Sequence, residues 1–107
     1  MAGRKVVEYL KAGVSPFAKW FSGLDAFAAA KVTVALYRLE QGNLSNVKSV
    51  GKGVSEYKID FGPGYRIYFG RDGRTVVVLL CAGGKKTQRR DITTAKEFWR
   101  DYKHGED

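Results

Sequence analysis

The sequence is poor in the residues that build metal centres and disulfides: its 107 residues include one cysteine, one histidine and two prolines. A single cysteine, Cys81, cannot form an internal disulfide, and it is expected to pack as a small buried hydrophobe. One Cys and one His cannot supply a zinc site or a Cys-His nucleophile. No apolar run approaches the ~20 residues that cross a bilayer, and residues 1–15 lack the pattern of a secretory signal. We therefore expect a cytoplasmic protein with no metal, no cofactor and no membrane segment.

Acidic residues are also scarce, because 11 Asp and Glu stand against 19 Lys and Arg, which gives a net charge of +8. Residues 48–90 contain ten of the cations and three of the acids, so this segment alone carries +7. A concentrated positive field attracts nucleic acid, an anionic membrane surface or an acidic protein. Composition does not choose among these partners. The length predicts a single domain over residues 1–107.

The N-terminal part of the sequence predicts a strand followed by a helical hairpin. Residues 4–10 are rich in β-favouring side chains. Ser15-Pro16 has the chemistry of an N-cap and first helical position, and predicts a short helix. Asp25 can cap a longer helix that runs to about Gln41. Its apolar residues recur at spacings of three and four on one stripe: Ala28, Val32, Ala35, Leu36 and Leu39.

Two strands of alternating polarity flank a tight turn. Apolar and polar residues alternate over residues 56–61 and again over residues 65–70, which is typical of half-buried strands. Between them, Gly62-Pro63-Gly64 can close an antiparallel connection. Lys58 and Arg66 then lie on neighbouring strands. If both side chains avoid the core, two cations meet on one face of the sheet.

The segments around this hairpin complete the predicted fold. Residues 43–55 are polar and contain glycine, so they predict a loop, with a short strand over residues 47–50 as the alternative. Residues 71–74 contain an Asp-Gly turn, and the apolar run 76–80 predicts a strand buried on both faces. Asp91 can cap a last helix. The order β-α-α-β-β-β-α predicts an α+β fold, a small twisted antiparallel sheet with the helices on one side and the basic side chains on the other.

A basic tract, residues 85–90, follows the buried strand directly. Four cations in six residues can hold a phosphodiester backbone, although a solvated surface loop would have the same composition. RNA cleavage without a metal is compatible with such a site, since the 2′-hydroxyl can attack its own phosphate. Arg66 suits charge stabilisation because its planar fork can hold a phosphoryl oxygen bidentately. The residues predicted to bind RNA phosphates are Lys48, Lys52, Lys85, Arg89 and Arg90.

Several separated blocks of the sequence match one family pattern in order. These blocks are Arg38-Leu39 with Gly42-Asn43, residues 50–54, residues 62–69, and residues 83–88 followed by Asp91-Ile92 and Ala95. The combination resembles bacterial toxins of the RelE/ParE superfamily, and is most similar to the HigB-like branch of addiction-module killer proteins.

The resemblance implies a RelE-like toxin domain over nearly the whole chain. For RelE-like and HigB-like members it implies an mRNA endonuclease that works on translating ribosomes, inhibits translation and binds a cognate antitoxin protein in a hetero-oligomer. RelE-like members use a basic site without metal. By motif, Arg66 corresponds to the phosphate-stabilising arginine, Lys58 to a lysine of the same site, and Lys86 to an arginine. Proton transfer is left open among Lys58, Lys86, Gln88 and Asp91.

Two other functions stay open from the sequence. One is a ParE-like toxin that inhibits DNA gyrase on the same fold and cuts no RNA. The other is an inactive module whose charge serves only to bind an acidic antitoxin segment.

Overall fold

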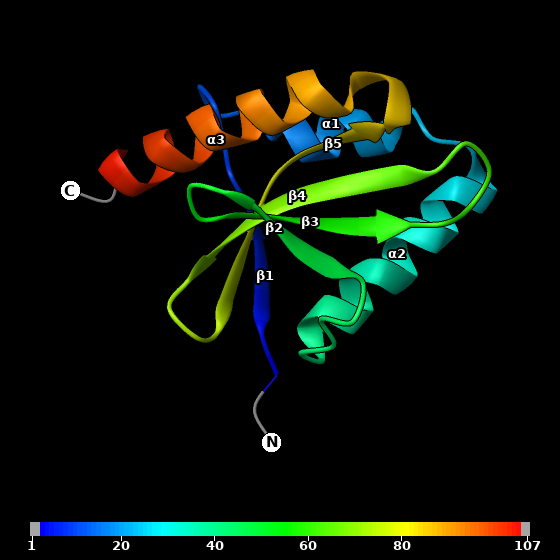
Figure 1. Ribbon diagram of the computed structural model, residues 1–107, viewed down its shortest axis with the longest axis horizontal. Coiled ribbons are helices and arrows are strands. Elements are labelled where there is room, and N and C mark those ends of the chain that lie inside the picture. Colours follow the sequence, from blue (N-terminus) through cyan, green and yellow to red (C-terminus); the bar gives the residue numbers. More distant parts are fainter. Residues whose placement is uncertain (1–2, 106–107) are drawn as a thin grey trace.

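The computed structural model describes residues 3–105, which form three α-helices and a five-stranded sheet (Figure 1). This mixed architecture confirms the predicted α+β class. The elements in chain order are β1 (Lys5–Glu8), α1 (Pro16–Ser22), α2 (Ala26–Glu40), β2 (Val47–Gly51), β3 (Val54–Ile59), β4 (Tyr65–Asp72), β5 (Val76–Gly84), the 3-10 turn η1 (Lys85–Thr87) and α3 (Gln88–Gly105).

The strands lie in the order β1-β5-β4-β3-β2. Strands β2 to β5 are antiparallel to their neighbours, as predicted, whereas β1 pairs in parallel with β5. The sheet is therefore mixed, because the helical hairpin carries the chain from β1 at one edge to β2 at the other. The segment predicted mainly as a loop contains β2, which gains its hydrogen bonds from β3. Lys58 and Arg66 are direct partners on β3 and β4, as the turn predicted.

Helices α1 and α2 pack on one face of the sheet. Both predicted caps are confirmed: Ser15 Oγ accepts from the Ala18 N–H at 2.9 Å, and Asp25 Oδ1 accepts from the Ala28 N–H at 2.8 Å. The predicted stripe of α2 is the buried one. The core on this side is formed by Phe17, Val32, Ala35, Leu39, Tyr57, Ile59, Ile67, Phe69, Val77 and Leu79.

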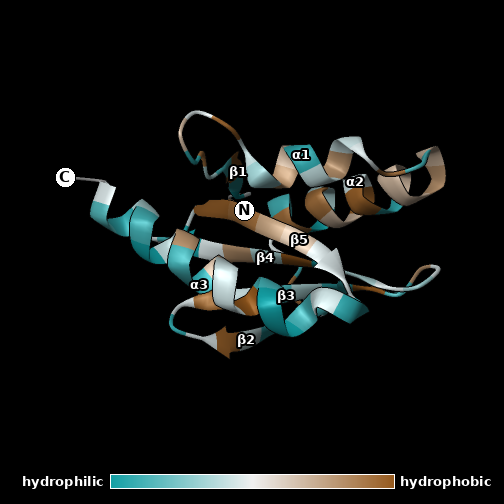
Figure 2. Cartoon of the chain, turned by 90° about the horizontal axis from the view of Figure 1, so that it is seen from above, coloured by the Kyte–Doolittle hydropathy of each residue, from teal (hydrophilic) through white to brown (hydrophobic). Residues whose placement is uncertain are grey.

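Helix α3 packs on the opposite face, so the prediction that all helices share one side is wrong (Figure 2). Its apolar stripe needs an apolar partner, and the second face supplies one in Val54, Tyr68 and Val78. Trp99 lies so close to β4 that a Cβ at Gly70 would sit 2.4 Å from the indole ring. Among residues 3–105, no helix has the length and apolar character needed to cross a membrane.

Candidate functional site

A buried carboxylate lies where the start of α3 crosses the sheet. Glu56 is 1% exposed, and its Oε2 lies 3.5 Å from Arg66 Nε. The same oxygen accepts hydrogen bonds from the Gln88 amide at 2.9 Å and from the Tyr68 hydroxyl at 3.3 Å. Its other oxygen, Oε1, lies 3.8 Å from Lys48 Nζ. We call these five residues the Glu56 cluster.

Strand register assembles the Glu56 cluster from four elements. Glu56 on β3 lies directly opposite Lys48 on β2 and Tyr68 on β4. Arg66 precedes Tyr68 by two residues, so both side chains share the sheet face that α3 covers. Gln88 is the first residue of α3. The cluster therefore forms only when α3 docks.

Sequence reasoning missed Glu56 and Tyr68 as members of the site. The alternating pattern placed Glu56 on the polar face of its strand, which suggested exposure to solvent. The sequence did contain a signal that Glu56 lies near the predicted site, because Glu56 is two residues from Lys58 and therefore shares its face of the strand. The covering of that face by α3 depends on tertiary packing and could not be inferred from the strand alone.

The cluster fixes the protonation of Tyr68 and the position of Arg66. Burial, followed by the charges of Glu56 and Asp91, raises the pKa of the Tyr68 hydroxyl above its ordinary value of 10, so it stays a hydrogen-bond donor. The Arg66 side chain is only 11% exposed. Its buried Nε has no hydrogen-bond partner within residues 3–105, despite the nearby carboxylate. An unsatisfied buried donor costs about 1–3 kcal/mol.

Arg66 also reaches a hollow beside the glycine-proline turn. This hollow has a volume of about 410 Å³ and is lined by Arg66, Lys58, Lys85 and the turn Gly62-Pro63-Gly64, among others. Lys58 is more than half exposed, and its Nζ lies 3.7 Å from Asp60. We call this depression the turn hollow. It presents three cations from β3, β4 and η1 to solvent, one of them anchored to the buried carboxylate.

Asp91 does not cap α3, because that helix continues directly from η1 and already begins at Gln88. The carboxylate of Asp91 instead accepts a hydrogen bond from Thr87 Oγ1 at 2.5 Å. This pair lies directly on β5, where a Cβ at Gly83 would be 2.1 Å from Asp91 Oδ2. A side chain at position 83 would therefore displace the Asp91 carboxylate. Asp91 ties the first turn of α3 to the sheet.

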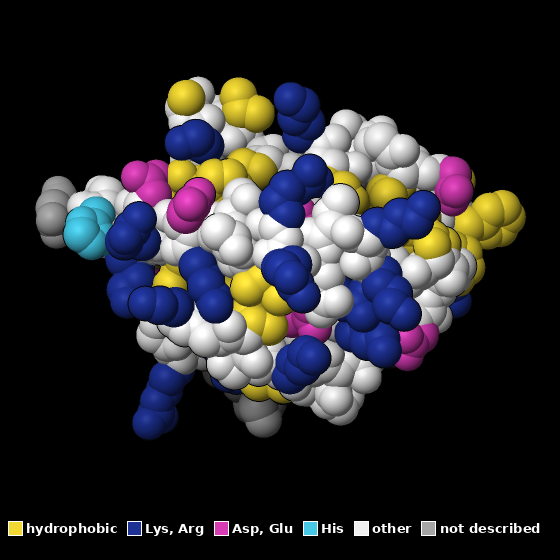
Figure 3. Space-filling view, turned by 45° about the horizontal axis from the view of Figure 1, so that its top comes forward, with side chains coloured by type: hydrophobic (Ala, Val, Ile, Leu, Met, Phe, Trp, Pro, Cys, Tyr) yellow, Lys and Arg dark blue, Asp and Glu magenta, His cyan; other side chains and the backbone are white. Residues whose placement is uncertain are grey.

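The predicted site residues fall into three groups. Lys48, Arg66 and Gln88 meet at Glu56, while Lys58 and Lys85 line the turn hollow with Arg66. Three more are exposed on η1 and the first turn of α3: Lys86, Arg89 and Arg90. Lys52 lies elsewhere, beside the middle of α3. Figure 3 shows Lys and Arg side chains distributed across this whole face, with few acidic side chains between them.

The buried Cys81 thiol lies on the side of the sheet that α3 covers. Burial, together with the charge of Asp91, raises the pKa of the Cys81 thiol from 9.0 to about 12. Its sulfur lies 3.6 Å from the Asp91 carbonyl oxygen. Within residues 3–105, no three His, Cys, Asp or Glu side chains are placed to hold a metal ion.

Comparison with known proteins gives two matches. The family described as "Phage derived protein Gp49-like (DUF891)" matches residues 19–100. An uncharacterized protein of Haemophilus influenzae (strain ATCC 51907 / DSM 11121 / KW20 / Rd) is 43% identical over 81 residues, which cover 75% of this chain and 82% of that protein. The family match includes all elements that form the Glu56 cluster and the turn hollow.

Proposed function

Because the chain belongs to the phage-derived Gp49-like family of toxin-like proteins from toxin–antitoxin systems, we propose that it is a ribosome-dependent mRNA endonuclease. In this proposal the protein cuts mRNA during translation and thereby arrests growth. The site is the turn hollow together with the Glu56 cluster. A cognate antitoxin would neutralise the toxin, in the cytoplasm, by forming a hetero-oligomer with it.

The observation that carries this proposal is the way Glu56 holds Arg66. The carboxylate is buried and receives two hydrogen bonds besides its contact with the guanidinium. Its Oε2 lies 3.5 Å from Arg66 Nε, and Arg66 also lines the turn hollow. Donors that are fixed before the substrate arrives need no reorganisation when charge develops, which makes them effective in transition-state stabilisation.

The chemistry that this arrangement supports is transfer of a phosphodiester to its own 2′-oxygen. The 2′-oxygen forms a bond to phosphorus as the bond from phosphorus to the 5′-oxygen breaks. The products are a 2′,3′-cyclic phosphate and a 5′-hydroxyl end. Arg66 would stabilise the additional negative charge on the phosphoryl oxygens, and Lys85 would hold the backbone.

Two protons must move in this reaction. The Lys58 ammonium borders the same hollow as Arg66 and can donate a proton to the departing 5′-oxygen. The 2′-hydroxyl proton passes to water in the open hollow. Gln88 and Asp91 act as positioning residues in this scheme, because their polar groups bond Glu56 and Thr87. Lys86, Arg89 and Arg90 would guide the RNA from the exposed surface of η1 and α3.

An antitoxin fits the charge of the molecule. The net charge is +8, so a partner with an acidic segment would meet a complementary surface. If that segment covered the turn hollow, it would block access of RNA. Loss of growth arrest when the neighbouring gene is co-expressed would support this arrangement.

The test uses a substitution that keeps the positive charge of Arg66 and replaces its planar guanidinium with an ammonium group. We expect Arg66→Lys to abolish growth arrest and mRNA cleavage, since lysine cannot hold a phosphate bidentately. Arg71→Lys is the matched control, because Arg71 is an exposed residue of the same strand. The control should keep full toxicity. Thermal unfolding of both variants separates loss of chemistry from loss of fold.

Three results would contradict the proposal. Full toxicity of Arg66→Lys, with cleavage at the same positions, would remove Arg66 from the site. Growth arrest with intact mRNA and a DNA-damage response would indicate a toxin that inhibits DNA gyrase instead. A wild-type protein that binds an acidic antitoxin and arrests nothing would be an inactive binding module.

A further inference from the structure

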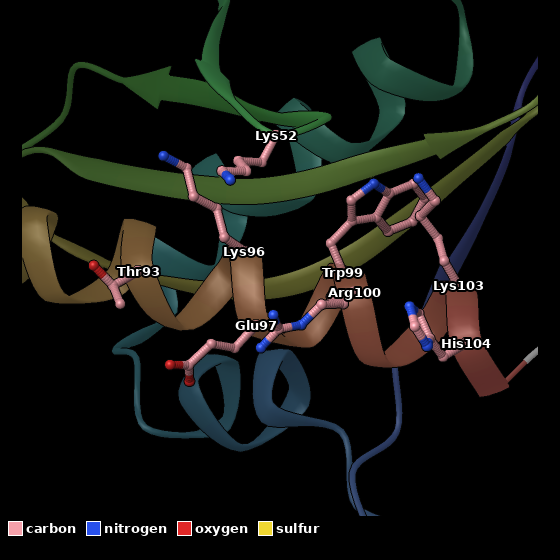
Figure 4. A pocket seen from close by; sticks show the side chains of 8 residues that line it. All are labelled: Lys52, Thr93, Lys96, Glu97, Trp99, Arg100, Lys103 and His104. Carbon is pink, nitrogen blue, oxygen red and sulfur yellow. The ribbon is translucent and has the colours of Figure 1, made fainter.

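A second basic hollow lies between the β2–β3 turn and α3, away from the turn hollow. Its volume is about 560 Å³, and it is lined by Lys52 of the turn and by α3 residues from Thr93 to His104 (Figure 4). Four cations border it: Lys52, Lys96, Arg100 and Lys103. We call this depression the α3 hollow. Of the four, only Lys52 belongs to the phosphate-binding set that the sequence predicted.

The backbone holds Lys52 in place at this hollow. Lys52 has φ 57°, a left-handed conformation that is unfavourable for any residue with a side chain. Gly51 and Gly53 on either side also have positive φ, and a Cβ at Gly53 would lie 2.7 Å from Trp99 Nε1. The turn is thus seated directly on α3. A lysine occupies a position where glycine would be less strained, which points to a use for its side chain.

The four cations have no close acidic partner in the part of the chain that the structure describes. Within residues 3–105, none of them lies within 4.0 Å of a carboxylate oxygen. Glu97, the acid at the rim, points away from Lys52 and Lys96 and so does Arg100, whereas the two lysines lie on the side of α3 that meets the turn (Figure 4). Lys103 Nζ lies 5.8 Å from the centre of the Trp99 ring. Like charges held together without a counter-charge favour an anionic ligand with several charges.

We propose that the α3 hollow is a second phosphate-binding site, which holds the RNA backbone outside the cleavage site. The ligand class rests on the proposed function, which makes RNA the substrate. Ammonium and guanidinium groups that reach phosphates position a strand without reading its bases. The α3 hollow would therefore bind RNA of any sequence, and it would add affinity and orientation to the turn hollow.

RNA is favoured over a protein partner because the exposed apolar side chains lie elsewhere. Phe27, Val34 and Tyr37 are between 46% and 77% exposed and belong to α2, on the opposite side of the sheet. The other exposed large hydrophobic residues, Leu10 and Val14, lie between β1 and α1 and do not line the α3 hollow. Trp99, the large aromatic residue of the α3 hollow, is only 6% exposed. Among residues 3–105, no exposed large hydrophobic side chain lines the α3 hollow, whereas protein interfaces have aromatic residues at their core.

The experiment measures binding of a fluorescent oligouridylate by anisotropy over a range of salt concentrations. The variant is Lys52→Gly/Lys96→Ala/Lys103→Ala, in which glycine suits the left-handed position of residue 52. We expect binding to weaken at least ~10-fold at low salt. The slope of log K against log salt should fall by about 2, because each lost phosphate contact on single-stranded RNA contributes about 0.7. An unchanged unfolding midpoint would show that the variant is folded.

The matched control, Lys5→Ala/Lys11→Ala/Lys19→Ala, removes the same charge from exposed positions on β1, the following loop and α1. Its salt slope should equal that of the wild type. An equal fall of the salt slope in both triple variants would overturn the proposal, since net charge alone would then explain binding. Binding of oligoglutamate, a probe for an acidic protein, is measured in the same way. If Lys52→Gly/Lys96→Ala/Lys103→Ala lost oligoglutamate binding and kept its RNA binding, the proposal would be overturned in favour of an acidic protein partner.

The two proposals can fail separately. Arg66→Lys should lose cleavage and keep the wild-type salt slope, because it retains the charge and lies outside the α3 hollow. If the wild-type protein cleaves no RNA and the variant with the altered α3 hollow still shows the reduced slope, the proposed function fails and this site stands. If the wild-type protein cleaves RNA and the α3-hollow variant has the same salt slope as the wild type, the proposed function stands and this site fails.

Discussion

Replacing Glu56 with glutamine is expected to destabilise the protein by about 3 kcal/mol. Removing one partner from a buried ion pair costs roughly 3–5 kcal/mol, because the other charge is left uncompensated. Here the uncompensated group is Arg66, whose side chain is 11% exposed. We take the lower end of the range, because glutamine can still accept the Tyr68 hydrogen bond and because Lys48 is 70% exposed and contributes little.

The assay is thermal or urea unfolding of the purified protein. For a chain of this size, about 3 kcal/mol corresponds to a fall in Tm of roughly 12 °C. Glu56→Gln/Arg66→Met removes both charges and should recover about 2 kcal/mol or more relative to the sum of the single substitutions. The reasoning would be refuted if Glu56→Gln changed stability by less than about 0.5 kcal/mol, or if the two substitutions were additive within that margin.

Three further predictions concern the crossing of α3 over the sheet. Gly83→Ala should lower the free energy of unfolding by about 1–3 kcal/mol, since the new Cβ would sit 2.1 Å from Asp91 Oδ2. Adding Asp91→Ala should recover part of this loss in urea unfolding. A Gly83→Ala protein as stable as the wild type would contradict the placement of α3. The Cys81 thiol should resist alkylation at pH 8 in the folded protein and react on unfolding. Because folding raises its pKa from 9.0 to about 12, its contribution to stability is complete below pH 9 and is lost as the pH rises toward 12. The fall in unfolding free energy over this range should be smaller in Cys81→Ala, and equal falls would contradict the burial of the thiol.

The local features of the fold could be predicted from the sequence. Ser15 and Asp25 cap the two N-terminal helices because their side chains satisfy free N–H groups within three residues. The turn Gly62-Pro63-Gly64 fixed the register that pairs Lys58 with Arg66. Each of these features depends on residues close together along the chain.

The centre of the candidate site depends on packing between distant elements. Glu56 and Gln88 are 32 residues apart, and they meet only because α3 docks on the second face of the sheet. The alternating pattern of β3 correctly placed Glu56 beside Lys58 on one face and could not show that the face is covered. Asp91 was interpreted as a cap because the helix start is ambiguous within a few residues, whereas η1 extends the helical segment to Lys85.

The most direct test of the proposed function is to map the ends of mRNA after brief induction of the protein. We expect cuts within translated coding regions that leave 5′-hydroxyl ends in the wild type and in Arg71→Lys, and no such cuts in Arg66→Lys. Growth arrest with intact mRNA would contradict it, as would cuts that leave 5′-phosphate ends or that persist in Arg66→Lys.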